Sequence, residues 1–311
     1  MSYQEEFSSL LSRRFGSDHV LNDVSLSGLT SFHIGGSADI LYTPQSTEEL
    51  AKALPLIAES GLPYFLMGRG SNLLVDDAGF RGVIIRLTEN FDTIKTEGNI
   101  LLAGGGATLG GVTKAAQKAG LTGLEFASGI PGTVGGAVYM NAGAYGGEIK
   151  DVLQEVSVLD LSGKVLHLDR SRLELGYRSS ILQYKSWIVL KAVFQLEEGD
   201  PEEILAKMKD FQQRRKDKQP LEYPNCGSVF KRPEGAFAGQ LIEQAGLKGL
   251  SLGGAEVSEK HAGFIINKGG ATSADVLAMI RFIQDRVEKS SGIHLVPEVC
   301  YLSPTGPEKL S

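Results

Sequence analysis

Short apolar segments alternate with amphipathic segments along most of the chain. Residues 50–58 and 108–119 carry apolar side chains three and four positions apart, which predicts helices that pack on one face. Residues 156–161 and 164–168 flank Ser162-Gly163, so we expect a β-hairpin there. Further apolar runs predict strands at 38–42, 64–67, 82–87, 100–103 and 187–194.

Two helix starts can be read from capping residues. Ser46 and Glu49 form a predicted capping box, in which each side chain binds the other residue's backbone N–H. Asp200 is a good N-cap and Pro201 suits the first helical position, so we expect a helix from there to Asp217. This second start also marks a domain boundary near Gly199.

The part of the chain after this boundary reads as a second, smaller unit. Strands are expected at 227–231, 262–266 and 295–302, and helices at 237–245 and 273–289. We therefore predict an α+β protein with an N-terminal helical segment (1–29), a first domain (30–200), a second domain (201–303) and a C-terminal tail (304–311).

Composition and charge exclude several classes of protein. The net charge is -6, which argues against a general nucleic-acid surface. No run of about 18 uncharged apolar residues occurs, and the first residues lack the pattern of a secretory signal, so we expect a cytoplasmic protein without a membrane span. Cys226 and Cys300 lie far apart in the sequence without histidines at ligand spacing, which predicts neither a disulfide framework nor a metal site.

Glycine is the informative excess, with 39 of 311 residues. Three glycine-rich segments lie at 68–75, 103–111 and 129–147. Glycines near strand ends let backbone N–H groups approach a diphosphate, although any one of these segments could equally serve tight turns. Neither GxGxxG nor GxxxxGK[ST] occurs, so the phosphate-binding site must differ from a Rossmann site or a P-loop.

The sequences GRGSNLLV (68–75) and GIPGTVGGAVYMNAGAYG (129–146) resemble the two flavin-binding stretches of the UDP-N-acetylenolpyruvylglucosamine reductase family. The similarity continues through GYRSS (176–180), NCGSVFKRP (225–233), LIEQAGLKG (241–249) and PEV (297–299). It implies a vanillyl-alcohol-oxidase-like (PCMH-type) FAD-binding domain followed by a smaller α+β substrate-binding domain. The residues that the resemblance assigns to FAD are Gly68, Arg69, Gly70, Ser71, Asn72, Gly129, Ile130, Gly132, Thr133, Gly135, Gly136, Asn141 and Gly143.

The family reaction, as the resemblance implies it, reduces UDP-N-acetylglucosamine enolpyruvate to UDP-N-acetylmuramate with NADPH, for peptidoglycan precursor synthesis. Hydride passes through flavin N5 to C3 of the enolpyruvyl group, and a proton is added at C2. Arg178 matches the family's carboxylate-binding arginine, and Ser228 matches the proton donor. Glu298 is expected opposite Arg178, bound to the substrate carboxylate or orienting Arg178, with a raised pKa.

Basic residues are the expected ligands of the substrate diphosphate: Arg215, Lys218, Lys231 and Lys248. Tyr139 is expected against the sugar or the diphosphate. Relatives with a longer chain carry an inserted tyrosine loop after the YR pair, and this chain resembles the shorter class, so its sequence leaves open how the site closes.

No second dinucleotide motif exists, so NADPH is expected to share the cleft of the UDP-sugar. A flavin oxidase of the same FAD family and a non-catalytic flavin or nucleotide sensor are the alternatives. The joint presence of Arg178, Ser228 and Glu298 favours the reductase over a sensor. The sequence leaves open whether NADPH or NADH is the donor. It also leaves open the oligomeric state, and it is compatible with a monomer.

Overall fold

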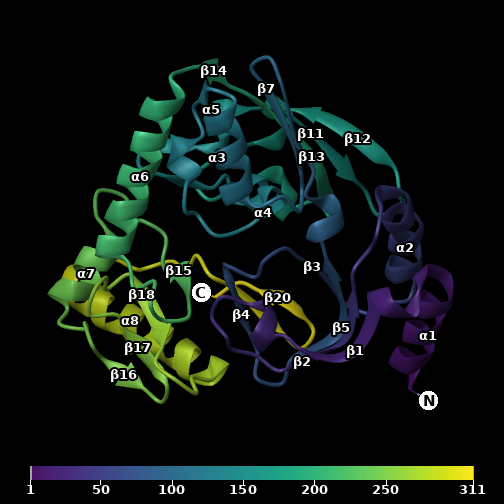
Figure 1. Ribbon diagram of the computed structural model, residues 1–311. Helices are drawn as coiled ribbons and strands as arrows, with labels where there is room; N and C mark the ends of the chain where they lie inside the picture. The colour runs from purple at the N-terminus through teal and green to yellow at the C-terminus, as the bar shows by residue number, and fades with distance from the viewer. Residues whose placement is uncertain (1, 311) are drawn as a thin grey trace. The chain divides into compact units, whose positions relative to one another are not determined.

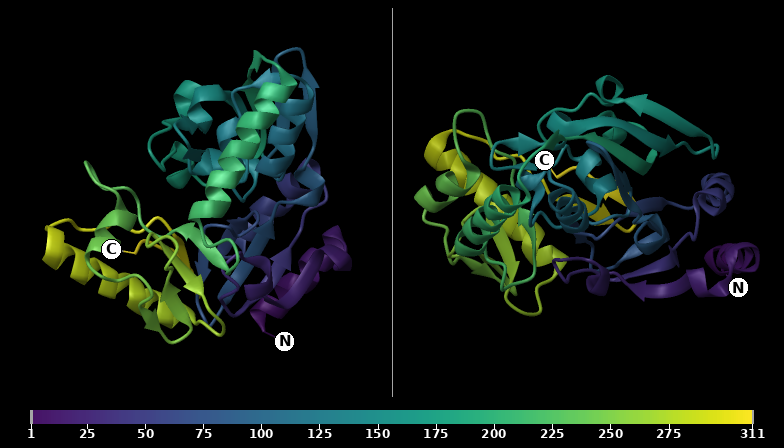
Figure 2. Two further views of the ribbon diagram at one scale, coloured as in Figure 1. Left: turned by 60° about the vertical axis from the view of Figure 1, so that its left-hand side comes forward. Right: turned by 45° about the horizontal axis from the view of Figure 1, so that its top comes forward.

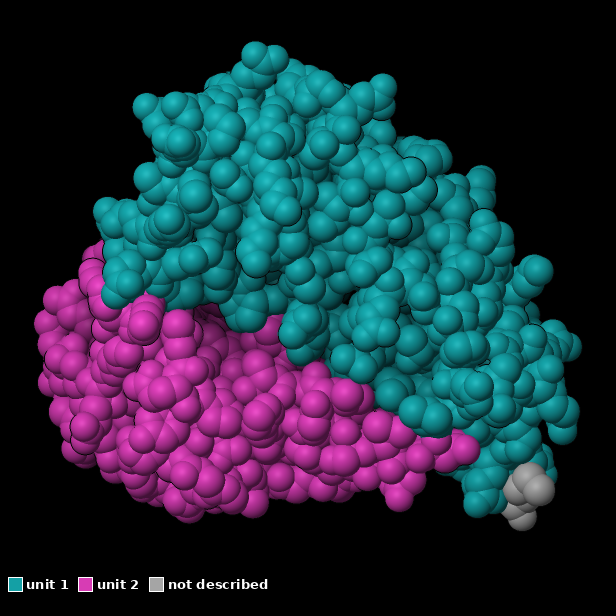
Figure 3. Space-filling model, viewed as in Figure 1, with its two compact units in different colours: residues 1–21, 41–69, 84–215 teal, residues 22–40, 70–83, 216–311 magenta. Residues whose placement is uncertain are grey.

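The structure is a computed structural model that describes residues 2–310 (Figures 1 and 2). Its chain divides into two compact units, coloured separately in Figure 3. Unit 1 holds residues 1–21, 41–69 and 84–215, and unit 2 holds 22–40, 70–83 and 216–311. The units are therefore interleaved along the chain, and the domain ranges given above remain a prediction.

The core of unit 1 is an antiparallel sheet covered by helices. Its five strands have the order β12-β11-β13-β7-β6. The strands are β6 (Ile94–Glu97), β7 (Ile100–Gly104), β11 (Leu153–Leu159), β12 (Val165–Asp169) and β13 (Ile188–Gln195). Helix α4 (Val134–Tyr139) packs against β13 and β7, and α3 (Leu109–Lys118) packs against β6 (Figure 1). Apolar side chains of both helices and of the sheet are buried together.

Unit 1 also contains further helices and two short pairs of strands. The remaining helices are α1 (Tyr3–Phe15), α2 (Thr47–Glu59), α5 (Ile149–Val152) and α6 (Pro201–Lys218), whose last residues belong to unit 2. The two-stranded pairs are β8 (Leu121–Thr122) with β14 (Glu197–Glu198), and β9 (Gly143–Ala144) with β10 (Gly147–Glu148). A further sheet, to which both units contribute residues, has the order β1-β2-β5-β3, from β1 (Val20–Ser25), β2 (Ser37–Tyr42), β3 (Tyr64–Met67) and β5 (Phe80–Arg86).

Unit 2 has its own sheet and its own core. The antiparallel sheet has the order β15-β18-β17-β16, from β15 (Asn225–Ser228), β16 (Ser251–Leu252), β17 (Ala255–Val257) and β18 (Phe264–Asn267). Helix α8 (Ser273–Ser291) packs on β16, β17 and α7 (Ala238–Gln244). Buried apolar side chains of α7, α8 and the sheet form the second core.

A second sheet of unit 2 brings the end of the chain beside its first third. Strand β19 (Cys300–Ser303) pairs with β20 (Gly306–Glu308) and, in parallel, with β4 (Leu73–Val75). Cys300 lies opposite Leu73, so the segment before β19 lies beside the end of the first glycine segment. This neighbourhood positions Glu298, as described below.

The elements predicted from periodicity are largely confirmed. The hairpin of β11 and β12 and the helix from Pro201 agree with the structure. The strand predicted at 295–302 begins only at Cys300. The capping box at Ser46 is half wrong: Ser46 accepts the Glu49 N–H, but the Glu49 carboxylate accepts the Tyr42 hydroxyl hydrogen bond (2.8 Å).

Across residues 2–310, no helix combines the length and the apolar character that crossing a membrane requires.

Candidate functional site

The second and third glycine segments singled out by the sequence, and Gly68 of the first, meet in unit 1. Gly135 N–H donates to the Gly105 carbonyl oxygen (2.8 Å), and Val134 N–H donates to that of Ala107 (2.8 Å). These bonds join the segment at 103–111 to the segment at 129–147. Gly68, in the first segment, lies directly against Thr133. Convergence of all three segments favours a ligand site over three separate turns.

The close approach at Gly68 explains why this position has no side chain. A Cβ atom there would lie 2.6 Å from Thr133 Oγ1 and 3.1 Å from its Cγ2. The Thr133 side chain is buried and its hydroxyl accepts the Gly136 N–H (3.3 Å) at the start of α4. Because this hydroxyl caps the helix, it cannot turn away without losing the cap.

Two buried donors beside the first and third glycine segments have no hydrogen-bond partner within residues 2–310. They are the hydroxyl of Thr30 and Nε of Arg215. Thr30 lies against Gly70, where an added Cβ would be 3.0 Å from the Thr30 Cα. Arg215 lies against Gly129, whose Cβ would be 3.5 Å from Nε. Burial lowers the pKa of Arg215, and the phenol of Tyr145 partly opposes this effect.

A buried donor without an acceptor is costly, so both positions fit a ligand that supplies oxygen or nitrogen acceptors. FAD carries such acceptors on its diphosphate and its ring system. Thr30 and Arg215 adjoin the first and third glycine segments, which are the segments predicted to bind FAD. The donors of this structure therefore fit FAD. Sequence reasoning missed Thr30, because a lone loop threonine has no signal until Gly70 is seen packed against it.

A tight turn in unit 1 carries Arg178. Gly176 and Ser179 exchange backbone hydrogen bonds of 3.1 and 3.2 Å, and Arg178 between them has φ +51°. The half-buried guanidinium donates through Nη2 to the Gly143 carbonyl oxygen (3.1 Å) and lies over the Tyr177 ring, 5.1 Å from its centroid. The structure thus places Arg178 at the third glycine segment.

Tyr139, at the end of α4, is 42% exposed, so its ring is accessible to a ligand. Its carbonyl oxygen accepts hydrogen bonds from Ser180 Oγ (2.7 Å) and from Gln183 Nε2 (3.2 Å). These bonds also tie the residues after the Arg178 turn to the third glycine segment.

Ser228 and Glu298 lie on neighbouring segments of unit 2. Ser228 ends β15 and is exposed. The Glu298 N–H donates to the carbonyl oxygen of Val229, the residue after Ser228 (2.7 Å). On its other side, the Glu298 carbonyl oxygen accepts a hydrogen bond from Asn72 Nδ2 (3.2 Å). The backbone of Glu298 is therefore fixed between the serine strand and the end of the first glycine segment.

Cys226, two residues before this serine on the same strand, is distinguished from it by burial. Burial, with a smaller contribution from the charge of Glu298, raises the pKa of Cys226 to about 12. The thiol is buried and stays protonated at neutral pH. Ser228, two residues away and exposed, is the accessible hydroxyl of this strand.

The predicted diphosphate ligands are only partly grouped. Arg215 belongs to unit 1, while Lys218, Lys231 and Lys248 belong to unit 2. The charges of Lys248 and Lys218 both lower the pKa of His261, after burial, which is the larger cause. These two lysines therefore lie near one ring, and Lys248 also pairs with Glu243 (2.8 Å).

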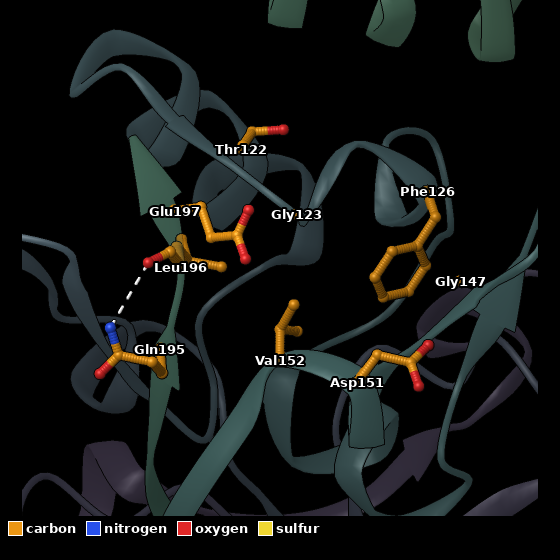
Figure 4. Close-up of a pocket in the computed structure, with 9 residues that line it drawn as sticks. All are labelled: Thr122, Gly123, Phe126, Gly147, Asp151, Val152, Gln195, Leu196 and Glu197. Atoms are coloured by element: carbon orange, nitrogen blue, oxygen red, sulfur yellow. Dashed lines mark hydrogen bonds between the residues drawn. The ribbon is translucent and has the colours of Figure 1, made fainter. Parts of the chain in front are cut away.

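A separate pocket of about 290 Å³ lies in unit 1 (Figure 4). The carboxylates of Asp151 and Glu197 and the ring of Phe126 stand around it. None of the residues predicted for the site lines this pocket, so it has no part in the arrangement described above. Its lining residues are Thr122, Gly123, Phe126, Gly147, Asp151, Val152, Gln195, Leu196 and Glu197.

Comparison with known proteins gives matches along most of the chain. Residues 38–169 match the family model of an FAD binding domain, and residues 219–302 match that of the UDP-N-acetylenolpyruvoylglucosamine reductase C-terminal domain. The UDP-N-acetylenolpyruvoylglucosamine reductase of Caldanaerobacter subterraneus subsp. tengcongensis is 52% identical over 270 residues, covering 87% of this chain and 89% of its own. That of Clostridium tetani is 46% identical over the full length of both chains.

Among solved structures, the UDP-N-acetylenolpyruvylglucosamine reductase of Thermus caldophilus is similar with a TM-score of 0.78 and 39% identity. The match covers 89% of this chain and 97% of that protein.

Proposed function

Because the chain belongs to the UDP-N-acetylenolpyruvoylglucosamine reductase family, we propose that it reduces UDP-N-acetylglucosamine enolpyruvate to UDP-N-acetylmuramate for peptidoglycan synthesis. The predicted family, the FAD cofactor and the fold class, an FAD-binding domain followed by a smaller α+β domain, are confirmed. The observation that carries the mechanism is the turn of Gly176–Ser179, which holds Arg178 against the glycine segment predicted for the flavin.

Once reduced by NADPH, bound FAD would supply the hydride that C3 of the enolpyruvyl double bond accepts. Negative charge then develops towards C2 and the carboxylate. The planar guanidinium of Arg178 suits bidentate binding of that carboxylate, and it stabilises the charge as it forms. Its fixed place in a strained turn supports this role, because a pre-positioned cation needs no rearrangement when the charge appears.

We assign the proton at C2 to the Ser228 hydroxyl and the orientation of the substrate carboxylate or of Arg178 to Glu298. A serine is a weak acid, but a carbanion-like centre is a strong enough base to take its proton. The exposure of Ser228 and the hydrogen bond that fixes the Glu298 backbone to the adjacent Val229 support the assignment.

In unit 1, backbone groups of the third glycine segment and Nε of Arg215 would offer donors to FAD, and in unit 2 the Thr30 hydroxyl beside Gly70 would do so. Arg215, predicted as a diphosphate ligand, lies beside Gly129, and we therefore propose that it serves the cofactor. Lys218, Lys231 and Lys248, with Tyr139, remain the proposed ligands of the substrate diphosphate and sugar.

NADPH is the proposed hydride donor, and it shares its place at the flavin with the UDP-sugar. Alternate occupancy predicts ping-pong kinetics and inhibition by excess substrate. We assign the enzyme to the cytoplasm, where its nucleotide substrates are found.

The test is an anaerobic measurement of the two half-reactions by flavin absorbance, in the wild type and in Ser228→Ala. Both proteins should be bleached by NADPH at the same rate. Colour should return on adding UDP-N-acetylglucosamine enolpyruvate in the wild type, and at least about 100-fold more slowly in the variant. Return of colour only on admitting oxygen would instead identify an oxidase, and a flavin that neither NADPH nor NADH bleaches would refute the reductase.

A further inference from the structure

Asn141, expected from the sequence to bind FAD, uses its side chain inside the protein. The residue is fully buried. Its Nδ2 donates to the Gly176 carbonyl oxygen (2.9 Å) and to Glu148 Oε2 (3.0 Å), and its Oδ1 accepts the Lys150 N–H (2.9 Å). Both N–H groups of the amide are therefore occupied, and no donor remains for a cofactor.

The partners also fix which way the amide points. A carbonyl and a carboxylate oxygen can only accept, so they must face Nδ2, while the backbone N–H of Lys150 must face Oδ1. Glu148 is itself held in place, since its carboxylate binds Lys150 Nζ (2.7 Å) and its N–H donates to Asp151 Oδ2 (2.8 Å). The amide thus has one orientation with all three bonds made.

Gly176 is the first residue of the turn that contains Arg178. Its carbonyl oxygen accepts two hydrogen bonds, one from Ser179 N–H within the turn (3.2 Å) and one from Asn141 (2.9 Å) outside it. Arg178 has φ +51°, a left-handed conformation that only glycine adopts without cost. Such a conformation persists only where neighbouring groups hold it.

We propose that Asn141 is a positioning residue for Arg178. Its amide ties the start of the Arg178 turn to the third glycine segment, and Arg178 Nη2 binds Gly143, two residues further along that segment (3.1 Å). Asn141 therefore sets the place of the guanidinium relative to the glycine segment without touching substrate or cofactor. The inference rests on the proposed carboxylate-binding role of Arg178.

The experiment separates this role from cofactor binding. In the holoenzyme, Asn141→Ala and the isosteric Asn141→Asp should keep the FAD dissociation constant and the rate of flavin reduction by NADPH within about twofold of wild type. Reoxidation by UDP-N-acetylglucosamine enolpyruvate should be 10- to 100-fold slower, as expected for a misplaced binding group. Asn141→Asp fills the same volume but sets a second acceptor against the Gly176 carbonyl and the Glu148 carboxylate, so the circular dichroism spectrum and the FAD content of both variants must match wild type before their rates are compared. Asn90→Ala, which removes an exposed amide of unit 1, is the matched control.

A double-mutant cycle with Arg178→Ala distinguishes positioning from general damage. If Asn141 acts through Arg178, its replacement should slow reoxidation no further in the Arg178→Ala enzyme. The proposal would be overturned if the fold-decreases in the reoxidation rate of the two single variants multiply in the double variant. Weaker FAD binding or slower reduction by NADPH in the single Asn141 variants would also overturn it. If Arg178→Ala is reoxidised by the enolpyruvyl substrate at the wild-type rate, the role proposed for Arg178 is refuted instead. If Arg178→Ala is reoxidised slowly but the Asn141 variants are reoxidised at the wild-type rate, only the positioning role is refuted.

Discussion

The contact of Gly68 with Thr133 makes a sharp prediction, because it is where the first and third glycine segments meet. Gly68→Ala adds one methyl group, whose carbon would lie 2.6 Å from Thr133 Oγ1. The threonine is buried and its hydroxyl caps α4, so it cannot move aside freely. We expect the substitution to push the two segments apart rather than to be absorbed by a flexible side chain.

The expected cost follows from comparable overpacked sites. Extra methyl groups in well-packed regions destabilise by about 1–3 kcal/mol. For a domain of about 150–250 residues this corresponds to a fall in Tm of roughly 2–12 °C. Thr133→Ala should cost about 0.5–2 kcal/mol through the lost cap. In the double variant the clash is gone, since the remaining Cβ of residue 133 is 3.4 Å away, so its stability should equal that of Thr133→Ala.

The assay is the Tm of the four FAD-loaded proteins, followed by flavin release and by circular dichroism. Gly110→Ala is the control, because a Cβ there meets nothing within 4 Å and the position lies in α3, so its Tm should not fall. The reasoning is refuted if Gly68→Ala keeps the wild-type Tm, or if its loss simply adds to that of Thr133→Ala.

Three further predictions concern other sites. Burial raises the pKa of the Glu125 carboxyl, but hydrogen bonds, the largest from Thr122 (2.6 Å), outweigh it and lower the pKa below its ordinary 4.5. The ionised carboxylate therefore stabilises the fold above that pH, and Glu125→Gln should lower the free energy of unfolding by about 2 kcal/mol at pH 7. Urea unfolding should show this difference from wild type shrinking as the pH falls below 4.5. Arg178→Lys should slow flavin reoxidation by the enolpyruvyl substrate about 100-fold in stopped-flow measurements, because a lysine cannot bind a carboxylate in bidentate fashion. An equal slowing of flavin reduction by NADPH would contradict this prediction. Burial raises the pKa of Cys226 to about 12 and that of Cys300 to about 11, so a thiol reagent at pH 8 should label neither in the folded protein, and rapid labelling would show that the site opens.

Local sequence determined the elements and the chemistry that the site contains. Capping residues set the start of the helix at Pro201, and alternating apolar positions set the hairpin of β11 and β12. These signals are local because a cap or a strand face depends on residues a few positions apart. The glycine segments and Arg178 could be singled out for the same reason, since each lies in a short stretch with a recognisable pattern.

Tertiary structure alone decided what these residues hold. Asn141 was expected to bind the cofactor, yet its amide binds Gly176, 35 positions further along the chain. Asn72 likewise binds Glu298, 226 positions away. The hydrophobic pattern of a chain specifies which face of an element is buried, but the partner of a polar group is whichever donor or acceptor packing brings within about 3 Å. Thr30 carries no local signal, and only the packing of Gly70 against it shows that its hydroxyl is buried without a partner in the described chain.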